Sequence, residues 1–274
     1  MSATTSAVTS RHISRQLNLH LAGAAKQIER LSSGSRLNRA SDDPAAVALT
    51  GGINAEVRAY AEGGRNVQQS ISMLQVADSA LGQMSDMVRR MAELAAQAAS
   101  STYTDADRVG ANQEFMALRD EIQRVAVSTT YNGLPLLTDD AEFITQAGPT
   151  GALSDIASIR FDDMRASGPR LALGTVTIDN RDVARQAISV VNQALDQVTE
   201  VRTRVGAYQN RLDKVATTAA SAIEDMVSTQ SAIGDTDMAQ AIGSLTRSQI
   251  LAEAAASMGR QSGGDVERLL GLLR

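Results

Sequence analysis

The sequence has 274 residues, of which 43% are apolar but only 3% are aromatic, so Ala, Val, Leu and Met supply most of its apolar surface. This composition favours long helices packed side by side over the core of a globular enzyme. The net charge of −5 argues against a nucleic-acid-binding protein, which needs a basic face, and the absence of cysteine excludes disulfides and thiolate sites.

Targeting and membrane segments are not apparent in the sequence. No run approaches the roughly 18 consecutive apolar residues of a membrane span. No apolar block near the N-terminus resembles the core of a secretory signal. Residues 1–28 contain Arg11, Arg15 and Lys26 but no acid, a pattern that also fits a mitochondrial transit peptide. We expect no membrane and no nucleic acid among the partners.

The N-terminal part of the chain is predicted to form two helices separated by a turn. Residues 1–10 are rich in Ser and Thr without periodicity, so we expect them to be mobile. A helix should run from about Ile13 to Leu31 and end in the breaker cluster Ser32–Ser35. The sequence Ser41–Pro44 is typical of a helix start, with acids and a proline in the first turn. The helix that follows should extend to Ala98, because apolar residues recur at alternating steps of three and four.

A third helix and a strand-rich segment follow. Thr104 or Asp105 should cap this helix, and Tyr131-Asn132-Gly133 should close it, because Gly after Asn favours a left-handed stop. Between Leu134 and Asn180 the pattern changes to short strand-like runs separated by Gly/Pro turns. The runs 142–146, 156–161 and 171–178 predict one or two β-hairpins.

The most regular apolar pattern of the chain lies in residues 191–226. Its steps alternate between three and four, which is a 3.5-residue repeat, so this helix should need partner helices along its whole length of roughly 50 Å. A break is expected at residues 233–237, where an acid should cap the next helix. That last helix should begin at Met238 and loosen at Gly263-Gly264.

These elements predict a mainly α-helical fold. Helix, break, long helices, short β insert, long helix, break and helix follow one another almost symmetrically. The simplest arrangement is a long antiparallel, coiled-coil-like helical rod, with both termini at one end and a small β-hairpin insert.

No set of side chains indicates catalysis or metal binding. His12 and His20 share a helix side, but no nearby Cys or carboxylate completes a metal site. The acids at 162–163 and 235–237 are better explained as loop acids and a helix cap than as cation ligands. No glycine pair stands in a phosphate-binding pattern. We predict that the protein is not an enzyme and has no cofactor and no metal.

Several separate motifs resemble those of bacterial flagellins, and they occur in the same order. They are Glu29–Asn38 (ERLSSGSRLN) with Ala40–Asp43, Asn66–Gln75, Glu93–Ala98, Thr130–Gly133, Leu245–Leu251 and the ending Leu272-Leu273-Arg274. The similarity spans nearly everything except residues 1–11 and parts of 137–180. Flagellins commonly begin with a Met-x-Ile-Asn-x-Asn pattern and carry large central domains; this chain has neither, so it resembles a minimal flagellin.

The resemblance implies a structural subunit of the flagellar filament, exported unfolded and polymerised into a helical tube for swimming motility. Residues 1–44 with 229–274 would form a terminal helical domain in the inner tube. Residues 45–228 would form the surrounding rod domain, with a β segment at about 134–180. The implied location is extracellular, without a cleaved signal peptide, which argues against a transit peptide. The implied partners are further copies of the chain or other flagellins, the cap and hook–filament junction proteins, and an export chaperone.

Two packing sets follow from the apolar pattern together with this resemblance. Because the terminal helices lack aromatic residues, we expect them to order only when neighbouring subunits bury them. The inner-tube set is Ile13, Leu17, Leu21, Ile28, Leu31, Ile242, Leu245, Ile250, Ala252, Ala255, Leu269 and Leu273. The rod-core set is Val57, Ile71, Leu74, Leu81, Phe115, Leu118, Ile122, Val198, Val205, Tyr208, Leu212 and Val215.

The resemblance also suggests two surface roles. In flagellins detected by Toll-like receptor 5, the contact helix carries residues that match Arg90, Leu94 and Glu114, while Ala92 replaces a second family Arg. The alternative is that Leu94 packs inside and that Arg90 and Glu114 are solvated or pair. Ser and Thr of the β segment are candidate O-glycan sites, namely Thr145, Thr150, Ser154 and Ser158.

Two other functions compete with the filament subunit. A hook–filament junction protein shares the terminal motifs, and a chemoreceptor-like signalling rod is also Ala-rich and built on heptads. The number of filament-type motifs and the Leu-Leu-Arg ending favour the filament subunit over the junction protein. A signalling rod should place a helical hairpin tip in the middle of the chain, where this sequence predicts strands.

Overall fold

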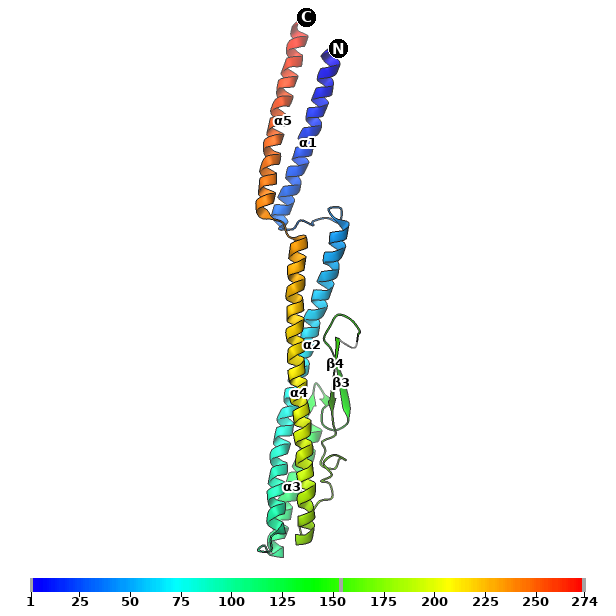
Figure 1. Cartoon of the computed structure of the whole chain (residues 1–274), viewed down its shortest axis with the longest axis vertical. Helices are drawn as coiled ribbons and strands as arrows, with labels where there is room; N and C mark the ends of the chain where they lie inside the picture. The colour runs from blue at the N-terminus through cyan, green and yellow to red at the C-terminus, as the bar shows by residue number, and fades with distance from the viewer. Residues whose placement is uncertain (1, 153–154, 273–274) are drawn as a thin grey trace. The chain divides into compact units, whose positions relative to one another are not determined.

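The computed structural model describes residues 2–152 and 155–272 (Figure 1). It confirms the predicted fold class: a mainly helical chain with antiparallel long helices and a small β insert. In chain order the elements are α1 (Ser2–Ser33), α2 (Pro44–Ala99), α3 (Asp105–Ser128), β1 (Thr130–Tyr131), β2 (Leu134–Pro135), β3 (Ala141–Gln146), β4 (Ile156–Phe161), α4 (Arg181–Gly234) and α5 (Met238–Leu272).

The chain divides into two compact units. The terminal unit comprises Met1–Ala55 and Asp225–Arg274, and the central unit comprises Glu56–Glu224. The long helices α2 and α4 each contribute residues to both units. Each unit has its own internal packing and is described separately.

The terminal unit is built on the antiparallel pair α1 and α5, which lie side by side (Figure 1). A Cβ placed on Gly23 would lie 3.6 Å from Ser248, and one placed on Gly259 would lie 3.5 Å from the Ile13 side chain. These two contacts establish an antiparallel register. Their small residues allow the two backbones to approach closely, since interaxial distance depends on the side chains at the contact.

The start of α1 and the end of α5 both differ from the sequence prediction. Residues 2–10 are helical rather than irregular, and α5 continues through Gly263-Gly264 to Leu272. No Gly or Pro interrupts residues 2–22. The antiparallel register places the first turns of α1 beside the last turns of α5.

The central unit contains one connected apolar core. The 3.5-residue stripe of α4 is buried through Val191, Ala194, Val198, Val201 and Val205. It belongs to the same core as apolar residues of α2 and α3. The expected need of this helix for partners along its length is therefore confirmed within the central unit.

The β insert is smaller than the sequence suggested, and it begins earlier. Helix α3 ends at Ser128, and Asn132 and Gly133 (φ 51° and 78°) form a two-residue turn that pairs Tyr131 with Leu134. The prediction that Asn-Gly ends the helix is wrong. The same left-handed preference produces a tight hairpin when extended residues flank the turn.

The second hairpin joins β3 and β4, antiparallel, with Phe143 opposite Ile159. The prediction of a strand at 171–178 is wrong. Leu171, Leu173 and Ile178 are buried in this segment, but it is irregular and Ala172 has φ 50°. Its alternating apolar residues pack onto the core without a neighbouring strand.

The helix starts follow the capping chemistry expected from the sequence. Asp43 accepts a hydrogen bond from the Ala46 N–H at 3.0 Å, and Asp237 accepts one from the Gln240 N–H at 3.0 Å. Of the two caps proposed for α3, the structure selects Thr104, which forms a capping box with Asp107. These caps fix where α2, α3 and α5 begin.

Candidate assembly surfaces

The terminal unit buries almost no large side chain. Among its described side chains, the buried apolar ones are Ala24, Ala241 and Ala252. Many of its larger apolar side chains are exposed, including Val8, Leu19, Leu21, Ile28, Leu49, Val227, Met238, Ile242, Ile250, Leu251 and Met258. Exposed apolar surface on this scale marks an interaction site.

The predicted inner-tube residues are split between the α1–α5 seam and this outer surface. Ala252 is buried, whereas Ile13, Leu17, Leu31, Leu245 and Ala255 are half-buried. Leu21, Ile28, Ile242 and Ile250 are 52–60% exposed. The side chain of Leu269 and all of Leu273 lie outside the described residues. One chain therefore does not bring this set together into a core.

In the terminal unit, the segment that follows α1 hydrogen-bonds to the segment between α4 and α5. Gly34, at φ 70°, ends α1, and Ser35 forms an isolated β-bridge with Asp235. The Arg36 N–H donates to the Gly234 carbonyl at 2.7 Å, and the Thr236 N–H donates to the Gly34 carbonyl at 2.9 Å. The segments 34–43 and 234–237, hereafter the paired connectors, thus hold each other in place.

An ion pair fastens the first connector to α1. The Lys26 ammonium lies 2.6 Å from the Asp42 carboxylate. This hydrogen bond lowers the pKa of Asp42 below its usual 3.8, against a smaller opposing effect of desolvation. The sequence predicted a helix break at Ser32–Ser35 and a helix start at Ser41–Pro44, and the structure shows how the connector between them is held.

The rod-core set lies mostly inside the central unit. Its fully buried members include Leu74, Leu81, Phe115 and Ile122 on α2 and α3. Ile71, Val198, Val205 and Leu212 are also buried, whereas Val57, Leu118, Tyr208 and Val215 are half-buried.

Close contacts hold the β3–β4 hairpin against α2. A Cβ on Gly63 would overlap the carbonyl oxygen of Ala147. The Asn66 side-chain amide donates to the Gln146 carbonyl at 3.1 Å, and the hydroxyls of Ser70 and Thr145 share a hydrogen bond of 2.6 Å. Glycine at position 63 is therefore required by the approach of the hairpin.

A buried ionic cluster lies after β4. The Asp162 side chain is only 5% exposed and pairs with Arg170 at 3.2 Å and with Arg204 of α4 at 2.7 Å. Burial by itself raises the pKa of Asp163, but hydrogen bonds from the Arg165 side chain and backbone outweigh it and lower that pKa. Asp162 and Asp163 lie in a loop, as expected, but they are buried rather than solvated. Sequence alone did not indicate this because Arg204 lies on a different element.

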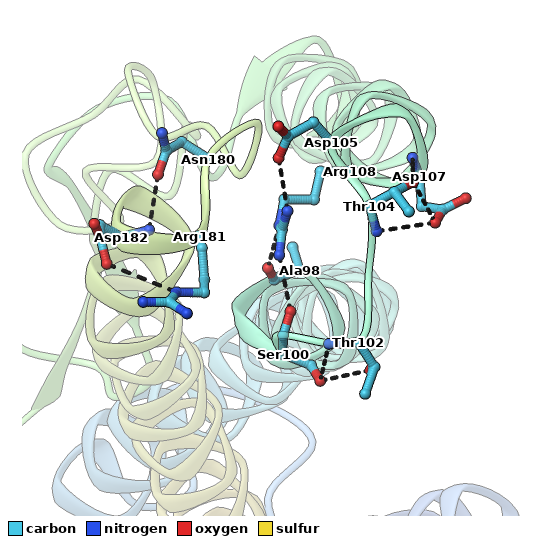
Figure 2. A network of polar contacts seen from close by, with 10 residues as sticks. All are labelled: Ala98, Ser100, Thr102, Thr104, Asp105, Asp107, Arg108, Asn180, Arg181 and Asp182. Atoms are coloured by element: carbon cyan, nitrogen blue, oxygen red, sulfur yellow. Dashed lines mark hydrogen bonds and ion pairs between the residues drawn. The ribbon is translucent and has the colours of Figure 1, made fainter.

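A second buried charge closes the turn between α2 and α3 (Figure 2). The Arg108 guanidinium donates to the carbonyls of Ala98 at 2.8 Å and Ser100 at 2.9 Å, and pairs with Asp105 at 2.8 Å. These contacts bind the carbonyl groups at the end of α2, which have no partner within the helix. No sequence motif singled out Arg108.

The suggested receptor patch contains one buried residue. Leu94 is 2% exposed, and the Arg90 guanidinium bonds to Glu114 at 2.8 Å and to Glu93 at 2.9 Å. This geometry matches the alternative in which Leu94 packs inside and the two charged residues pair.

The candidate O-glycan residues differ in accessibility. Thr145 is 5% exposed and hydrogen-bonded to Ser70, so the prediction that it is an accessible acceptor is wrong. Ser158 is exposed on β4, and Thr150 is exposed but hydrogen-bonded to Asp155. Ser154 lies outside the described residues.

Neither a membrane-spanning helix nor a metal cluster was found in the part of the chain that the structure describes. None of these helices is both long and apolar enough to cross a membrane. No three potential ligands among His, Asp and Glu come together in a way that could hold a metal ion.

Comparison with known proteins identifies both ends of the chain. Residues 5–141 match the model of the bacterial flagellin N-terminal helical region, and residues 188–273 match that of the C-terminal helical region. A flagellin of Halalkalibacterium halodurans is 34% identical, over 95% of this chain and 95% of the relative. Flagellin FlaB2 of Treponema pallidum is 32% identical, over 91% and 92%. The crystal structure of Bacillus cereus flagellin is similar, with a TM-score of 0.51 and 28% identity over 57% of this chain and 88% of that one.

Proposed function

The chain belongs to the bacterial flagellin family and is a structural subunit of a flagellar filament, and from this premise we propose that α1 and α5 carry the contacts through which copies polymerise. The observation behind this proposal is the terminal unit, whose described buried apolar side chains are three alanines while many larger ones are exposed. Fully burying a Leu or Ile side chain contributes about 1.5–3 kcal/mol. Polymerisation buries these side chains against neighbouring copies of the chain.

The terminal helices line the inner tube of the filament, and the central unit surrounds them. In this arrangement residues 1–44 and 229–274 form the inner domain, and residues 45–228 form the rod domain with its β segment. The difference in burial between the two units supports this assignment, because an inner layer is enclosed by other subunits while an outer layer must be stable against solvent.

The chain leaves the cell unfolded and orders its ends when it joins the filament. A pair of helices without large buried side chains is marginal in isolation. Addition to the growing end, under the cap protein and starting from the junction proteins, buries the outer faces of α1 and α5. An export chaperone covers the same faces beforehand. The filament then lies outside the cell and serves swimming motility.

Two surface roles are also proposed. Toll-like receptor 5 would contact Arg90 and Glu114, since Leu94 is buried; a receptor reporter assay on soluble monomer should give a signal, and silence at high dose would contradict it. Glycans would attach at Thr150, Ser154 or Ser158. An intact mass equal to that of the unmodified sequence would contradict glycosylation.

Elongation of filament seeds tests the proposed function. Purified monomer is added to short seeds, and the product is imaged by electron microscopy. We expect the seeds to lengthen into tubes. Monomer that only caps seed ends or binds hooks would indicate a hook–filament junction protein instead. Monomer that binds neither would contradict a filament role and favour a signalling rod.

A further inference from the structure

A polar pocket of about 240 Å³ lies beside the paired connectors of the terminal unit. Residues Gln27 and Arg30 from α1, Arg36 and Thr236 from the connectors, and Gln240 and Ser244 from α5 line it. The pocket therefore forms only when both ends of the chain have folded together.

Hydrogen-bond donors without partners gather around this pocket. The buried polar side-chain atoms that lack a hydrogen bond in the described residues are Arg30 Nε, Asn38 Nδ2, Thr236 Oγ1 and Asp162 Oδ2. The last lies 2.7 Å from Arg204 in an ion pair of the central unit. Arg30 and Thr236 both line the pocket, whereas Asn38 is not among its lining residues. Buried polar groups are normally hydrogen-bonded, so this cluster needs an explanation.

The chemistry of these atoms specifies the missing partner. Arg Nε can only donate and a Thr hydroxyl can donate, so a partner common to Arg30 and Thr236 must be an acceptor. An ionised oxygen acceptor forms the strongest hydrogen bonds with guanidinium groups. A metal cation or an apolar group could satisfy none of these donors.

Charge at the pocket favours the same class of ligand. The neighbouring cations Lys26 and Arg39 pair with Asp42 and Glu29. In contrast, Arg30 and Arg36 form no ion pair within the described residues. Arg36 is held in place because its guanidinium donates to the Ile233 carbonyl at 2.9 Å.

One acid also lines the pocket. Asp237 is oriented by the Gln240 N–H, which donates to its carboxylate at 3.0 Å as the cap of α5. Its charge balances one of the two arginines, so the pocket keeps a net positive charge.

We propose that this pocket is a binding site for an oxyanion, either a carboxylate or a phosphate group, held by Arg30 and Arg36 with Thr236. Two sources can supply such a group. One is a free anion in solution. The other is a carboxylate side chain of a second copy of the chain, since the sequence has 31 acidic residues against 26 Lys and Arg. Only this second source rests on the proposed filament function.

The first arm of the test titrates the full-length chain with inorganic phosphate, both in assembled filaments, where the terminal unit is ordered, and as monomer, using sodium chloride at equal ionic strength as the control. The NMR signal of the Arg30 Nε–H in the filament, identified by its loss in Arg30→Gln, should shift saturably with phosphate but not with chloride. Loss of one charged hydrogen-bond partner in Arg36→Gln should weaken binding roughly tenfold. Arg15→Gln, an exposed arginine of α1 outside this pocket, should leave the titration unchanged.

The second arm measures the monomer concentration needed to elongate wild-type seeds. If the ligand is a carboxylate of a second copy, Arg30→Gln should raise this concentration roughly tenfold. Arg30→Lys, which keeps the charge, should bring the required monomer concentration part of the way back to the wild-type value. Phosphate should inhibit assembly of the wild type but not of Arg30→Gln. If the ligand is a free anion, phosphate should instead promote assembly of the wild type but not of Arg30→Gln.

The two arms together decide the inference. It is overturned if phosphate moves no Arg30 signal and Arg30→Gln either elongates seeds like the wild type or is not improved by Arg30→Lys. Failure of the wild type itself to elongate seeds would contradict the filament function instead, and the phosphate titration alone would then decide whether the pocket binds an oxyanion. A circular dichroism melt of each variant confirms that the central unit, which lacks Arg30, remains folded.

Discussion

The two units of this chain solve the problem of burying apolar surface differently. The central unit encloses Leu, Met, Phe and Ile side chains in one core, whereas the buried apolar side chains described for the terminal unit are alanines. Both units consist mainly of long helices, so helix content does not distinguish them. The difference is where many large apolar residues point: inward in the central unit, and toward solvent in the terminal unit for side chains such as Leu21, Ile28 and Ile250.

The largest expected effect is a contrast between the two units. A variant of the central unit should lose monomer stability, whereas a variant of the terminal unit should lose seed elongation. Phe115→Ala removes a fully buried ring of the central unit and should lower the free energy of unfolding by about 3–5 kcal/mol. Ile250→Ala, at a side chain 60% exposed in the terminal unit, should change it by less than about 0.5 kcal/mol but reduce seed elongation. Urea unfolding of the monomer and the elongation assay check both. Equal loss of monomer stability in the two variants would contradict the difference in burial between the two units.

The buried ionic cluster should also matter for the central unit. Asp162→Asn leaves Arg170 without a carboxylate and Arg204 with Glu200 alone, and it should cost about 2 kcal/mol, because both arginines remain about one-third exposed. Asp196→Asn, at an exposed acid of α4, serves as the matched control and should have little effect. Urea unfolding measures both variants. An Asp162→Asn protein as stable as the control would show that the cluster contributes no stability.

Two adjacent glycines of α2 offer a sharper test of packing. Gly63→Ala drives a methyl group into the Ala147 carbonyl and should destabilise the central unit by about 1–3 kcal/mol, less the gain in helix propensity. Gly64→Ala has nothing within 4 Å and should stabilise the helix by up to about 1 kcal/mol. Thermal melts compare the pair, and the same sign for both would contradict the close docking of the β3–β4 hairpin.

The smallest effect concerns acid and the paired connectors. Because Lys26 lowers the pKa of Asp42 in the folded state, the Asp42 contribution to stability is fully present above its usual pKa of 3.8. It is lost as the pH falls through the lower folded value. An NMR titration of the Asp42 carboxyl in the assembled filament, where α1 is ordered, should show this lowered pKa, and Lys26→Met should return it toward 3.8. An unchanged titration in Lys26→Met would show that the ion pair does not form in solution.

The sequence predicted the parts of the fold that depend on local chemistry. Helix starts at Asp43, Thr104 and Asp237 follow from side chains that hydrogen-bond to the next turn. The α4 stripe follows from the spacing of its apolar residues. These signals lie within a few residues of each other, so they can be recognised without knowing the fold.

Features that depend on distant partners were missed. Asn132-Gly133 has the left-handed preference of a helix stop and of a hairpin turn, and only the pairing of Tyr131 with Leu134 distinguishes them. Asp162 resembled a solvated loop acid until Arg204 was placed beside it.

Hydrogen exchange of the monomer and of the assembled filament tests the central claim most directly. Amides of α2, α3 and α4 within the central unit should be protected in both states, because their core is complete in one chain. Amides of α1 and α5 should exchange quickly in the monomer and become protected only in the filament. Protection of α1 and α5 in the monomer equal to that of the central unit would contradict the account, since the terminal unit would then be stable without its neighbours.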